Sequence, residues 1–431
     1  MADFKKKLFN GVLWRLVNIV SAFVFNIILV NGLGAADSGR FLFQLNNLSF
    51  IILFLGFGME SGMSYYATRR EIPRSELFTI AVCWSIAASV LFTFLFYGSG
   101  FFSRSLVPEK TPFIPVYIFG SLLITFLGAL FYSSHDNAPP NLLVAGANTL
   151  LIIVLAKYRL TGKPIGVESF INYYFIVYGL TGLLMALILF KKGTDFGRLR
   201  LGSGMVSPLL RYSFHSFMLA GLYTLLKRSD YWLVERFCTP GDMGNYIQST
   251  KIIQLILLFP SLASFTLYPL LVESIHQQRD SEAKVIRLSA IYMLFAVIIS
   301  TPIALLGFLI FPFLYGHTFE KMNHTVLLLI PGLVTLAGTY PLTAYFSGIN
   351  RNSINISALT FSIIIMVISD LLLLPHYLIF GAAAGSSLAG LFYFAYLLLK
   401  FKKINNLTLT EISKTIKLKE AFFSLYKSAG R

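Results

Sequence analysis

Charged residues are scarce in this sequence. Only 13% of its 431 residues are Asp, Glu, Lys or Arg, whereas 56% are hydrophobic and the mean hydropathy is +0.72. A soluble protein of this length needs a large charged surface, and this composition cannot supply one. The scarcity therefore excludes a soluble globular protein and indicates an integral membrane protein.

Acidic residues are the scarcer of the two charge types. The chain has 19 Asp and Glu against 35 Lys and Arg, which gives a formal net charge of +16. The basic residues fall mainly in short connections between apolar runs and in the segment after residue 400. This distribution is typical of topology signals and of contact with anionic headgroups. We therefore expect anionic membrane lipids as partners and no nucleic acid.

Cysteines and long polar loops are also few. Cys83 and Cys238 lie in different segments, which argues against a disulfide and leaves no set of metal ligands. The sequence has no glycine-rich phosphate loop, and its polar connections are too short to hold an extramembrane catalytic domain. We therefore expect no enzyme activity, no catalytic residues, no bound cofactor and no metal.

Long apolar runs are what the sequence has in abundance. About twelve runs of about 20 residues can each cross a bilayer as a helix, which predicts an all-α polytopic membrane protein. They lie near 8–32, 39–58, 76–98, 113–134, 141–157, 168–190, 209–236, 243–265, 285–312, 324–346, 353–375 and 378–400. Roughly three times as many basic residues fall on one predicted side as on the other, which places both termini in the cytoplasm.

The two halves of the chain look like repeats. Asp37 and Gly39, after the first run, correspond to Asp242 and Gly244, after the seventh. We expect both aspartates to accept free amide hydrogens at the start of the next helix. Tandem duplication of an even number of spans gives parallel halves, and transporters of this design bind substrate between them. We predict two parallel repeats of about six helices around a central cavity. The predicted parts are 1–192 and 209–400, a cytoplasmic linker at 193–208 and a basic cytoplasmic tail at 401–431.

Four basic residues fall within the apolar runs: Arg15, Lys227, Arg228 and Lys251. A charged side chain in hydrocarbon costs roughly 3 kcal/mol or more, so each should face a wet cavity or a partner. In one interpretation they converge on a single cavity, where they favour a pyrophosphate group or an acidic glycan. Alternatively, Arg15 reaches the lipid headgroups by snorkelling, and Lys227 pairs with Asp230 on the same helical face.

Three acidic residues lie in or beside the apolar runs. Asp230, Glu60 and Asp370 are candidates for carrying a coupling proton or sodium ion. Each also has a structural alternative. Asp230 could be the charge partner of Lys227, and Glu60 and Asp370 could lie at helix ends in water.

Amides and glycines add weaker signals. Gln44 and Asn47 share one face of the second run, and Gln248 lies in the eighth. Such amides either tie helices together or form hydrogen bonds with sugars, and the sequence leaves both interpretations open. Gly381 and Gly385, four residues apart in the last run, predict close helix packing.

Two stretches of the sequence resemble a known family. The first contains Leu33-Gly-Ala-Ala-Asp-Ser-Gly-Arg-Phe and later Gly56-Phe-Gly-Met-Glu-Ser-Gly, and the second runs from Arg228-Ser-Asp-Tyr-Trp-Leu to Asp242-Met-Gly-Asn-Tyr-Ile. Both resemble the polysaccharide (Wzx-type, O-antigen) flippases. These flippases belong to the multidrug/oligosaccharidyl-lipid/polysaccharide exporter superfamily.

The resemblance implies a function. Such a flippase moves an undecaprenyl-pyrophosphate-linked oligosaccharide across the bacterial inner membrane by alternating access through a cationic cavity. The resemblance implies a lipid-linked glycan as substrate, a functional monomer, and a glycan polymerase and chain-length machinery as partners. Arg15 and the basic residues of the seventh and eighth runs fit the cationic cavity by position.

Two other functions stay open. A cation-coupled multidrug or metabolite antiporter of the same superfamily should carry acids rather than bases in its cavity. A membrane glycosyltransferase or polymerase should have a substantial outer loop with catalytic residues.

Overall fold

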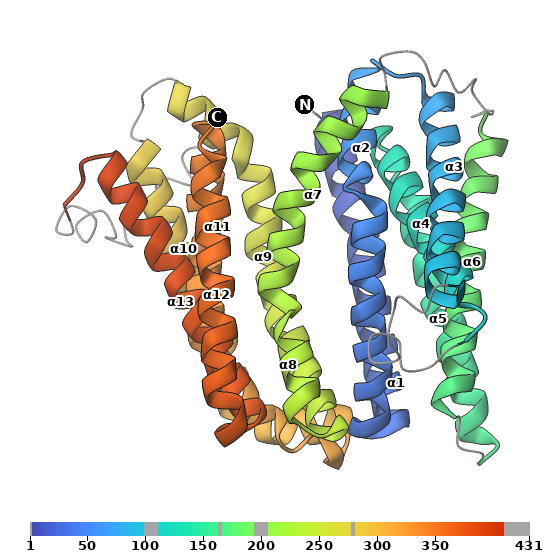
Figure 1. Ribbon diagram of the computed structural model, residues 1–431. Helices are drawn as coiled ribbons and strands as arrows, with labels where there is room; N and C mark the ends of the chain where they lie inside the picture. Colours follow the sequence, from blue (N-terminus) through green and yellow to red (C-terminus); the bar gives the residue numbers. More distant parts are fainter. Residues whose placement is uncertain (1, 99–110, 163–165, 194–205, 277–280, 409–431) are drawn as a thin grey trace. The chain divides into compact units, whose positions relative to one another are not determined.

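The computed structural model describes residues 2–98, 111–162, 166–193, 206–276 and 281–408, and over these ranges the chain is helical with no strand (Figure 1). The first helices are α1 (Ala2–Gly56), α2 (Met59–Arg69), α3 (Arg74–Thr93) with the short π-helix η1 (Phe94–Gly98), α4 (Ile114–Ser133), α5 (Ala138–Leu160) and α6 (Val167–Lys191). They are followed by α7 (Val206–Arg228), α8 (Asp230–Phe237), α9 (Pro240–His276), α10 (Ser281–Tyr315), η2 (His317–Phe319), α11 (Met322–Gly348), α12 (Asn352–Tyr377) and α13 (Ile379–Ile404).

The helices follow the predicted spans closely. Among the described residues, 10 helices are long and apolar enough to cross a membrane. One of them, α1, holds the first two predicted spans, because the chain only kinks at Gly34, where φ is 75°. The seventh span is not among the 10, because it is broken into α7 and α8 and carries several basic residues. The predicted all-α polytopic fold is confirmed.

The helix α2 was missed by the sequence analysis because its short, polar sequence forms no apolar run. It begins after Gly58, whose φ of 67° is a left-handed conformation that favours glycine. A Cβ at Gly58 would lie 2.5 Å from the backbone oxygen of Ser213, and one at Gly62 would lie 2.5 Å from the Ser213 Oγ. The first turns of α7 therefore pack directly on α2.

The chain forms two compact units, Met1–Gly221 (the first unit) and Leu222–Arg431 (the second unit), and each is described by itself. The division falls inside α7, whereas the sequence analysis placed the linker between the halves at 193–208. The packing of the early turns of α7 on α2 explains why they belong to the first unit. Most of the predicted linker (194–205) and of the predicted tail (409–431) lies outside the described residues.

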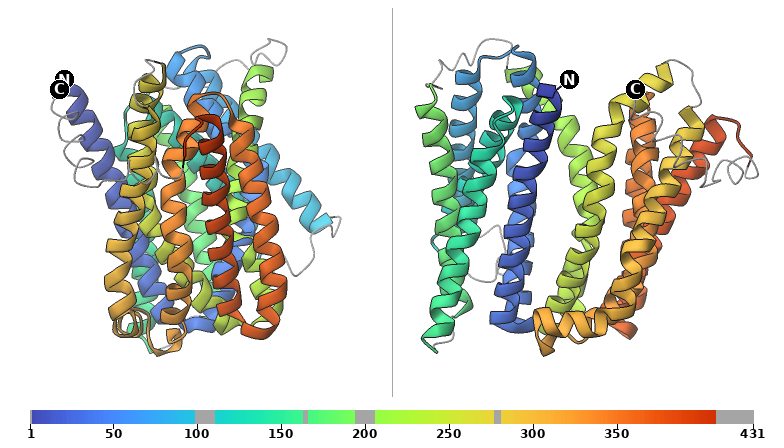
Figure 2. Two further views of the ribbon diagram at one scale, coloured as in Figure 1. Left: turned by 90° about the vertical axis from the view of Figure 1, so that its left-hand side faces the viewer. Right: turned by 180° about the vertical axis from the view of Figure 1, so that it is seen from behind.

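Within each unit, close helix crossings pack the helices against one another. In the first unit, a Cβ at Gly120 of α4 would lie 2.5 Å from the Cα of Gly179 in α6. In the second unit, a Cβ at Gly381 of α13 would lie 2.6 Å from the carbonyl oxygen of Leu373 in α12. The helices α12 and α13 lie side by side in every view (Figure 2). The close packing predicted from Gly381 and Gly385 is therefore confirmed.

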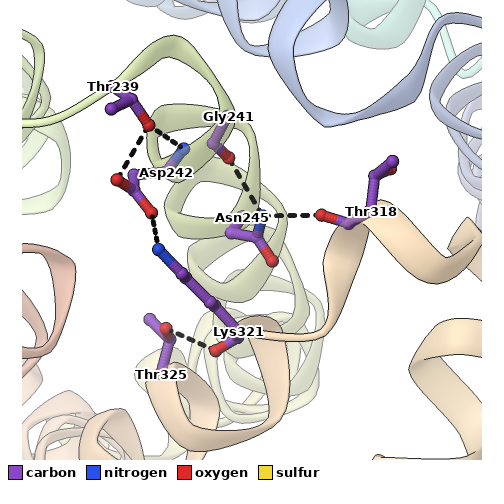
Figure 3. Close-up of polar contacts among 7 residues, drawn as sticks. All are labelled: Thr239, Gly241, Asp242, Asn245, Thr318, Lys321 and Thr325. Carbon is purple, nitrogen blue, oxygen red and sulfur yellow. Dashed lines mark hydrogen bonds and ion pairs between the residues drawn. The ribbon is translucent and has the colours of Figure 1, made fainter.

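The start of α9 explains the aspartate of the second repeat segment. Thr239 Oγ1 accepts the amide hydrogen of Asp242 at 3.2 Å and donates to Asp242 Oδ2 at 2.8 Å, with Pro240 at the first helical position (Figure 3). The Nζ of Lys321 donates to Asp242 Oδ1 at 2.7 Å. Asp242 thus ties the start of α9 to the start of α11, and it is Thr239 rather than Asp242 that accepts an amide hydrogen.

The equivalent position in the first repeat segment makes a different contact. Asp37 lies 3.9 Å from Arg40, one turn further along α1. The non-helical backbone of Gly34 (φ 75°, ψ 176°) separates two helices within α1, and Asp37 lies in the first turn of the second. A carboxylate is favoured there by the helix dipole, and the capping role of Asp37 stays a prediction.

Candidate functional site

Three of the four predicted cations gather in the second unit. Lys227 and Arg228 form the last residues of α7, and Lys251 lies on α9. The charge of Arg228 acts on both lysines, so each of them lies near Arg228. All three are partly buried. Like charges held together in a partly buried site are typical of functional sites, and we call these residues the cationic cluster.

Arg15 belongs to the first unit. Its side chain is exposed, and its guanidinium lies 5.3 Å from the ring centroid of Tyr132 on α4. The hydroxyl of Tyr132 donates to Asn141 Oδ1 of α5 at 3.4 Å. Arg15 therefore contacts an aromatic ring whose hydroxyl is itself hydrogen-bonded. Its convergence with the cationic cluster on one cavity stays a prediction, because the units are described separately.

A small cavity of 60 Å³ lies inside the second unit beside the cationic cluster. Its polar lining comes from α7, α8, α9 and α13, and includes Lys227, Asp230, Thr250, Gln254 and Ser386. A water molecule needs roughly 10–15 Å³ of such space. The cavity therefore has room for a few waters or a small cation.

The predicted ion pair between Lys227 and Asp230 is not formed. The Nζ of Lys227 lies 4.2 Å from the ring centroid of Tyr223, in a cation–π contact within α7. Asp230 Oδ2 instead accepts hydrogen bonds from Tyr246 at 2.5 Å and from Ser386 at 3.0 Å. The helix breaks at Ser229, so Lys227 and Asp230 do not share one continuous helical face. The prediction of this pair was wrong.

Asp230 and Asp370 form an acidic pair in the interior of the second unit. Their exposed fractions are 2% and 0%, and their charges act on each other. Within the described part of the chain, Asp230 Oδ1 and both carboxylate oxygens of Asp370 have no hydrogen-bond partner. Gly385 makes room for Asp370, since a Cβ there would collide with Asp370 Oδ1. The interpretation of Asp370 as a water-exposed helix-end residue is therefore wrong.

The acidic pair has the chemistry of a cation or proton site. A buried carboxylate without donors is costly unless a proton or a cation neutralises it. Besides the two carboxylates, the hydroxyls of Tyr246 and Ser386 supply oxygen ligands at Asp230. Oxygen ligands alone suit hard cations rather than transition metals. Over the described residues, no three His, Cys, Asp or Glu side chains gather as a metal centre.

Glu60 is not part of this pair. It lies in the first turn of α2, in the first unit, and is partly buried. Burial raises the pKa of the Glu60 carboxyl. A carboxylate in the first turn is also favoured by the helix dipole, so this position fits the interpretation of Glu60 as a helix-end residue.

The three predicted amides are buried in the helix bundles. The exposed fractions are 2% for Gln44, 2% for Asn47 and 0% for Gln248, and each has an interaction partner. Their burial favours the interpretation that they tie helices together rather than bind sugar.

Sequence reasoning missed the hydroxyls that complete the site. Tyr246 lies in the repeat segment after the seventh span and Ser386 follows Gly385, but nothing in the sequence shows that both reach Asp230. It also missed Tyr223, whose hydroxyl lies 2.8 Å from that of Tyr340 on α11. The only available signal was polar residues at helical spacing in apolar runs.

Solved transporter structures share this fold. The lipid II flippase MurJ, in an inward closed conformation, aligns with a TM-score of 0.72 over 96% of this chain and 92% of its own, at 13% identity. An inward-facing multidrug resistance MATE family transporter of the MOP superfamily aligns with a TM-score of 0.67 over 92% of this chain and 99% of its own, at 15% identity. This chain folds like these transporters.

A third structure extends the comparison. A MOP superfamily transporter from Pyrococcus furiosus, described by the reverse polarity of its binding pocket, aligns with a TM-score of 0.59 over 92% of this chain and 94% of its own, at 16% identity. No protein-family model matches the sequence, and no curated protein matches it. At these identities the likeness shows the fold, and the substrate has to be argued from the residues of this chain.

Proposed function

We propose that this protein is a flippase that moves an undecaprenyl-pyrophosphate-linked oligosaccharide across a bacterial inner membrane by alternating access. The observation that carries the proposal is the cationic cluster of Lys227, Arg228 and Lys251 in a transporter fold. Basic side chains held together in a partly buried site favour a pyrophosphate group. Arg15 is the first unit's candidate for the same headgroup. Both termini are cytoplasmic, and the protein acts as a monomer beside a glycan polymerase and chain-length machinery.

Pocket charge argues against the multidrug alternative. An antiporter for cationic drugs needs acids where the substrate binds, whereas the cluster is basic. Asp230 of the acidic pair lines a cavity of 60 Å³ that has room for a few waters or an ion, which suits a coupling cation. The Pyrococcus furiosus transporter, with its reverse pocket polarity, supports the view that this fold accepts either sign of charge. The connections described between the helices are too short for a catalytic domain, which disfavours the glycosyltransferase alternative.

The acidic pair supplies the energy coupling in this proposal. A proton or sodium ion binds between Asp230 and Asp370, assisted by the hydroxyls of Tyr246 and Ser386. The support is the set of buried carboxylate oxygens that lack donors, which a bound cation would satisfy.

Removal of the cluster tests the function in cells. Arg228→Ala and Lys251→Ala, each in a strain lacking the native gene, should lower surface glycan by about tenfold or more, as for loss of a charged contact of about 1.4 kcal/mol. Protein abundance in the membrane should stay unchanged. Arg236→Ala, at an exposed site on α8, is the matched control and should keep normal glycan. Normal glycan in both cluster variants would refute the role of the cluster.

A further inference from the structure

Lys227 and Asp230 line the same cavity without touching. The ammonium of Lys227 rests on the ring of Tyr223, 4.2 Å from its centroid. The carboxylate of Asp230 is held on one side by Tyr246 and Ser386, and its Oδ1 has no partner among the described residues. Lys227 carries the opposite charge and lines the same cavity, so it is a candidate partner for this oxygen. Lys227 and Asp230 therefore line one cavity without forming an ion pair.

The cavity gives the lysine room to move. Its 60 Å³ lies among Lys227, Asp230, Thr250, Gln254 and Ser386, so both charged groups face the same space, and the lysine side chain is long and flexible. The ring of Tyr223 is itself fixed, because its hydroxyl is bonded to that of Tyr340 at 2.8 Å. Tyr223 therefore offers a stable resting place for the ammonium when Asp230 is occupied.

We propose that Lys227 is an internal competitor of the coupling cation. With a proton or sodium ion on the acidic pair, Lys227 rests on Tyr223 beside Arg228 and adds its charge to the cationic cluster. When that cation leaves, Lys227 turns to Asp230, neutralises it and withdraws its charge from the cluster. This inference rests on the proposed coupling at Asp230 and Asp370.

In this proposal, the movement of Lys227 between Tyr223 and Asp230 couples the acidic pair to the cationic cluster. A cation on the acidic pair raises the positive charge available to a pyrophosphate, and its departure lowers it. Because such coupling is reciprocal, a bound pyrophosphate must equally strengthen cation binding. In this proposal the bistable element that the linkage requires is a single side chain, Lys227, which contacts Tyr223 in the structure and would contact Asp230 in the other state.

Sodium titration of the purified full-length protein tests the exchange. The readout is the thermal unfolding midpoint, which rises when a ligand binds only the folded state. The titration is made with sodium chloride against choline chloride at several pH values, so that protons and sodium are separated. Lys227→Met should lower the half-saturating cation concentration by about tenfold, because the competitor is gone. Lys227→Arg keeps the positive charge and should stay closer to the native value than Lys227→Met does, and Lys284→Met, at an exposed site on α10, is the charge-matched control.

Each outcome decides the inference. An unchanged half-saturating concentration in Lys227→Met overturns it, and so does the absence of any cation response in both the native protein and Lys227→Met. A role of Lys227 in packing alone would shift the midpoint without sodium and leave the half-saturating concentration as it was. In an Asp230→Asn background, the Lys227→Met change should have no further effect on cation binding. If Asp230→Asn abolishes the cation response while Lys227→Met leaves it unaltered, the exchange is wrong and the proposed coupling stands.

Discussion

The two units treat polar groups in their interiors differently. In the first unit, Tyr178 donates to Asn148 Oδ1 at 3.2 Å, and Asn148 donates to Ser21 Oγ at 3.0 Å. These neutral groups satisfy one another and join α1, α5 and α6. In the second unit, Asp230 and Asp370 are ionisable and keep oxygens without donors among the described residues. A satisfied network stabilises a structure, whereas a buried carboxylate without donors is costly unless a proton or a cation neutralises it. The difference lies in the ionisable groups, because both side-chain polar atoms of Asn46 in the first unit also lack a partner among the described residues.

The largest expected effect comes from neutralising the acidic pair. The double variant Asp230→Asn and Asp370→Asn should reduce gradient-driven glycan transport by about 100-fold, since one ionised contact of about 3 kcal/mol is lost. Its free energy of unfolding should not fall, because the variant removes two buried charges. Transport in proteoliposomes with imposed proton or sodium gradients measures the first effect, and thermal unfolding measures the second. If transport by the double variant depends on the gradient as strongly as transport by the native protein, the acidic pair is not the coupling site.

The neutral network of the first unit should respond in the opposite way. Asn148→Ala removes the acceptor of the Tyr178 hydroxyl, while Ser21 still donates to the carbonyl oxygen of Asn18, and it should lower the free energy of unfolding by about 1–3 kcal/mol. The half-saturating sodium concentration should remain at the native value. Denaturant unfolding in detergent, combined with the sodium titration, measures both. A changed cation response with unchanged stability would show that this network is not a scaffold.

Two glycines of α13 allow cation binding at Asp370 to be separated from helix packing in the second unit. Gly385→Ala pushes on the carboxylate of Asp370 and should weaken cation binding by about tenfold. Gly381→Ala pushes on the backbone of Leu373 and should lower stability without changing the cation response. The thermal midpoint with and without sodium separates the two effects. Equal cation responses in the two variants would contradict the placement of Asp370 in the site.

The smallest structural effect is expected at Arg15. Its exposed cation–π contact with Tyr132 is worth about 0.5–1 kcal/mol, so Arg15→Ala should change stability by no more than that. If the first unit also contributes a cation to the headgroup, glycan export should fall while Arg15→Lys keeps most of it. Surface glycan and protein abundance, measured together, decide the point. Normal export by Arg15→Ala would assign Arg15 to the lipid interface.

Hydropathy and charge predicted the fold well. Apolar runs of membrane length placed most ends of the long helices within a few residues, although α9 continues past the predicted end at 265 to His276. The same signal could not find α2, since helices that lack an apolar run depend on local contacts such as those of Gly58 and Gly62 with α7. It also could not place the boundary between the units inside α7, because that boundary depends on which neighbours each turn of the helix contacts.

The sequence indicated the charged residues of the candidate site but not the contacts that these residues make. A charged side chain in an apolar run is costly unless it has a partner or faces a wet cavity. This cost identified Lys227, Arg228, Lys251, Asp230 and Asp370 as candidates. The spacing of Lys227 and Asp230 indicated an ion pair only on the assumption of a continuous helix, and the break at Ser229 removed that assumption. The hydroxyls of Tyr246 and Ser386 come from helices distant in sequence, and only the tertiary structure brings them to Asp230.

Direct binding of a pyrophosphate headgroup is the decisive measurement. The purified protein in nanodiscs should bind undecaprenyl pyrophosphate, and raising the salt concentration should weaken that binding. Arg228→Ala should weaken binding by about tenfold or more, and Arg236→Ala should leave it unchanged. Equal affinity of the native protein and Arg228→Ala for this lipid would contradict the assignment of the cationic cluster as the headgroup site.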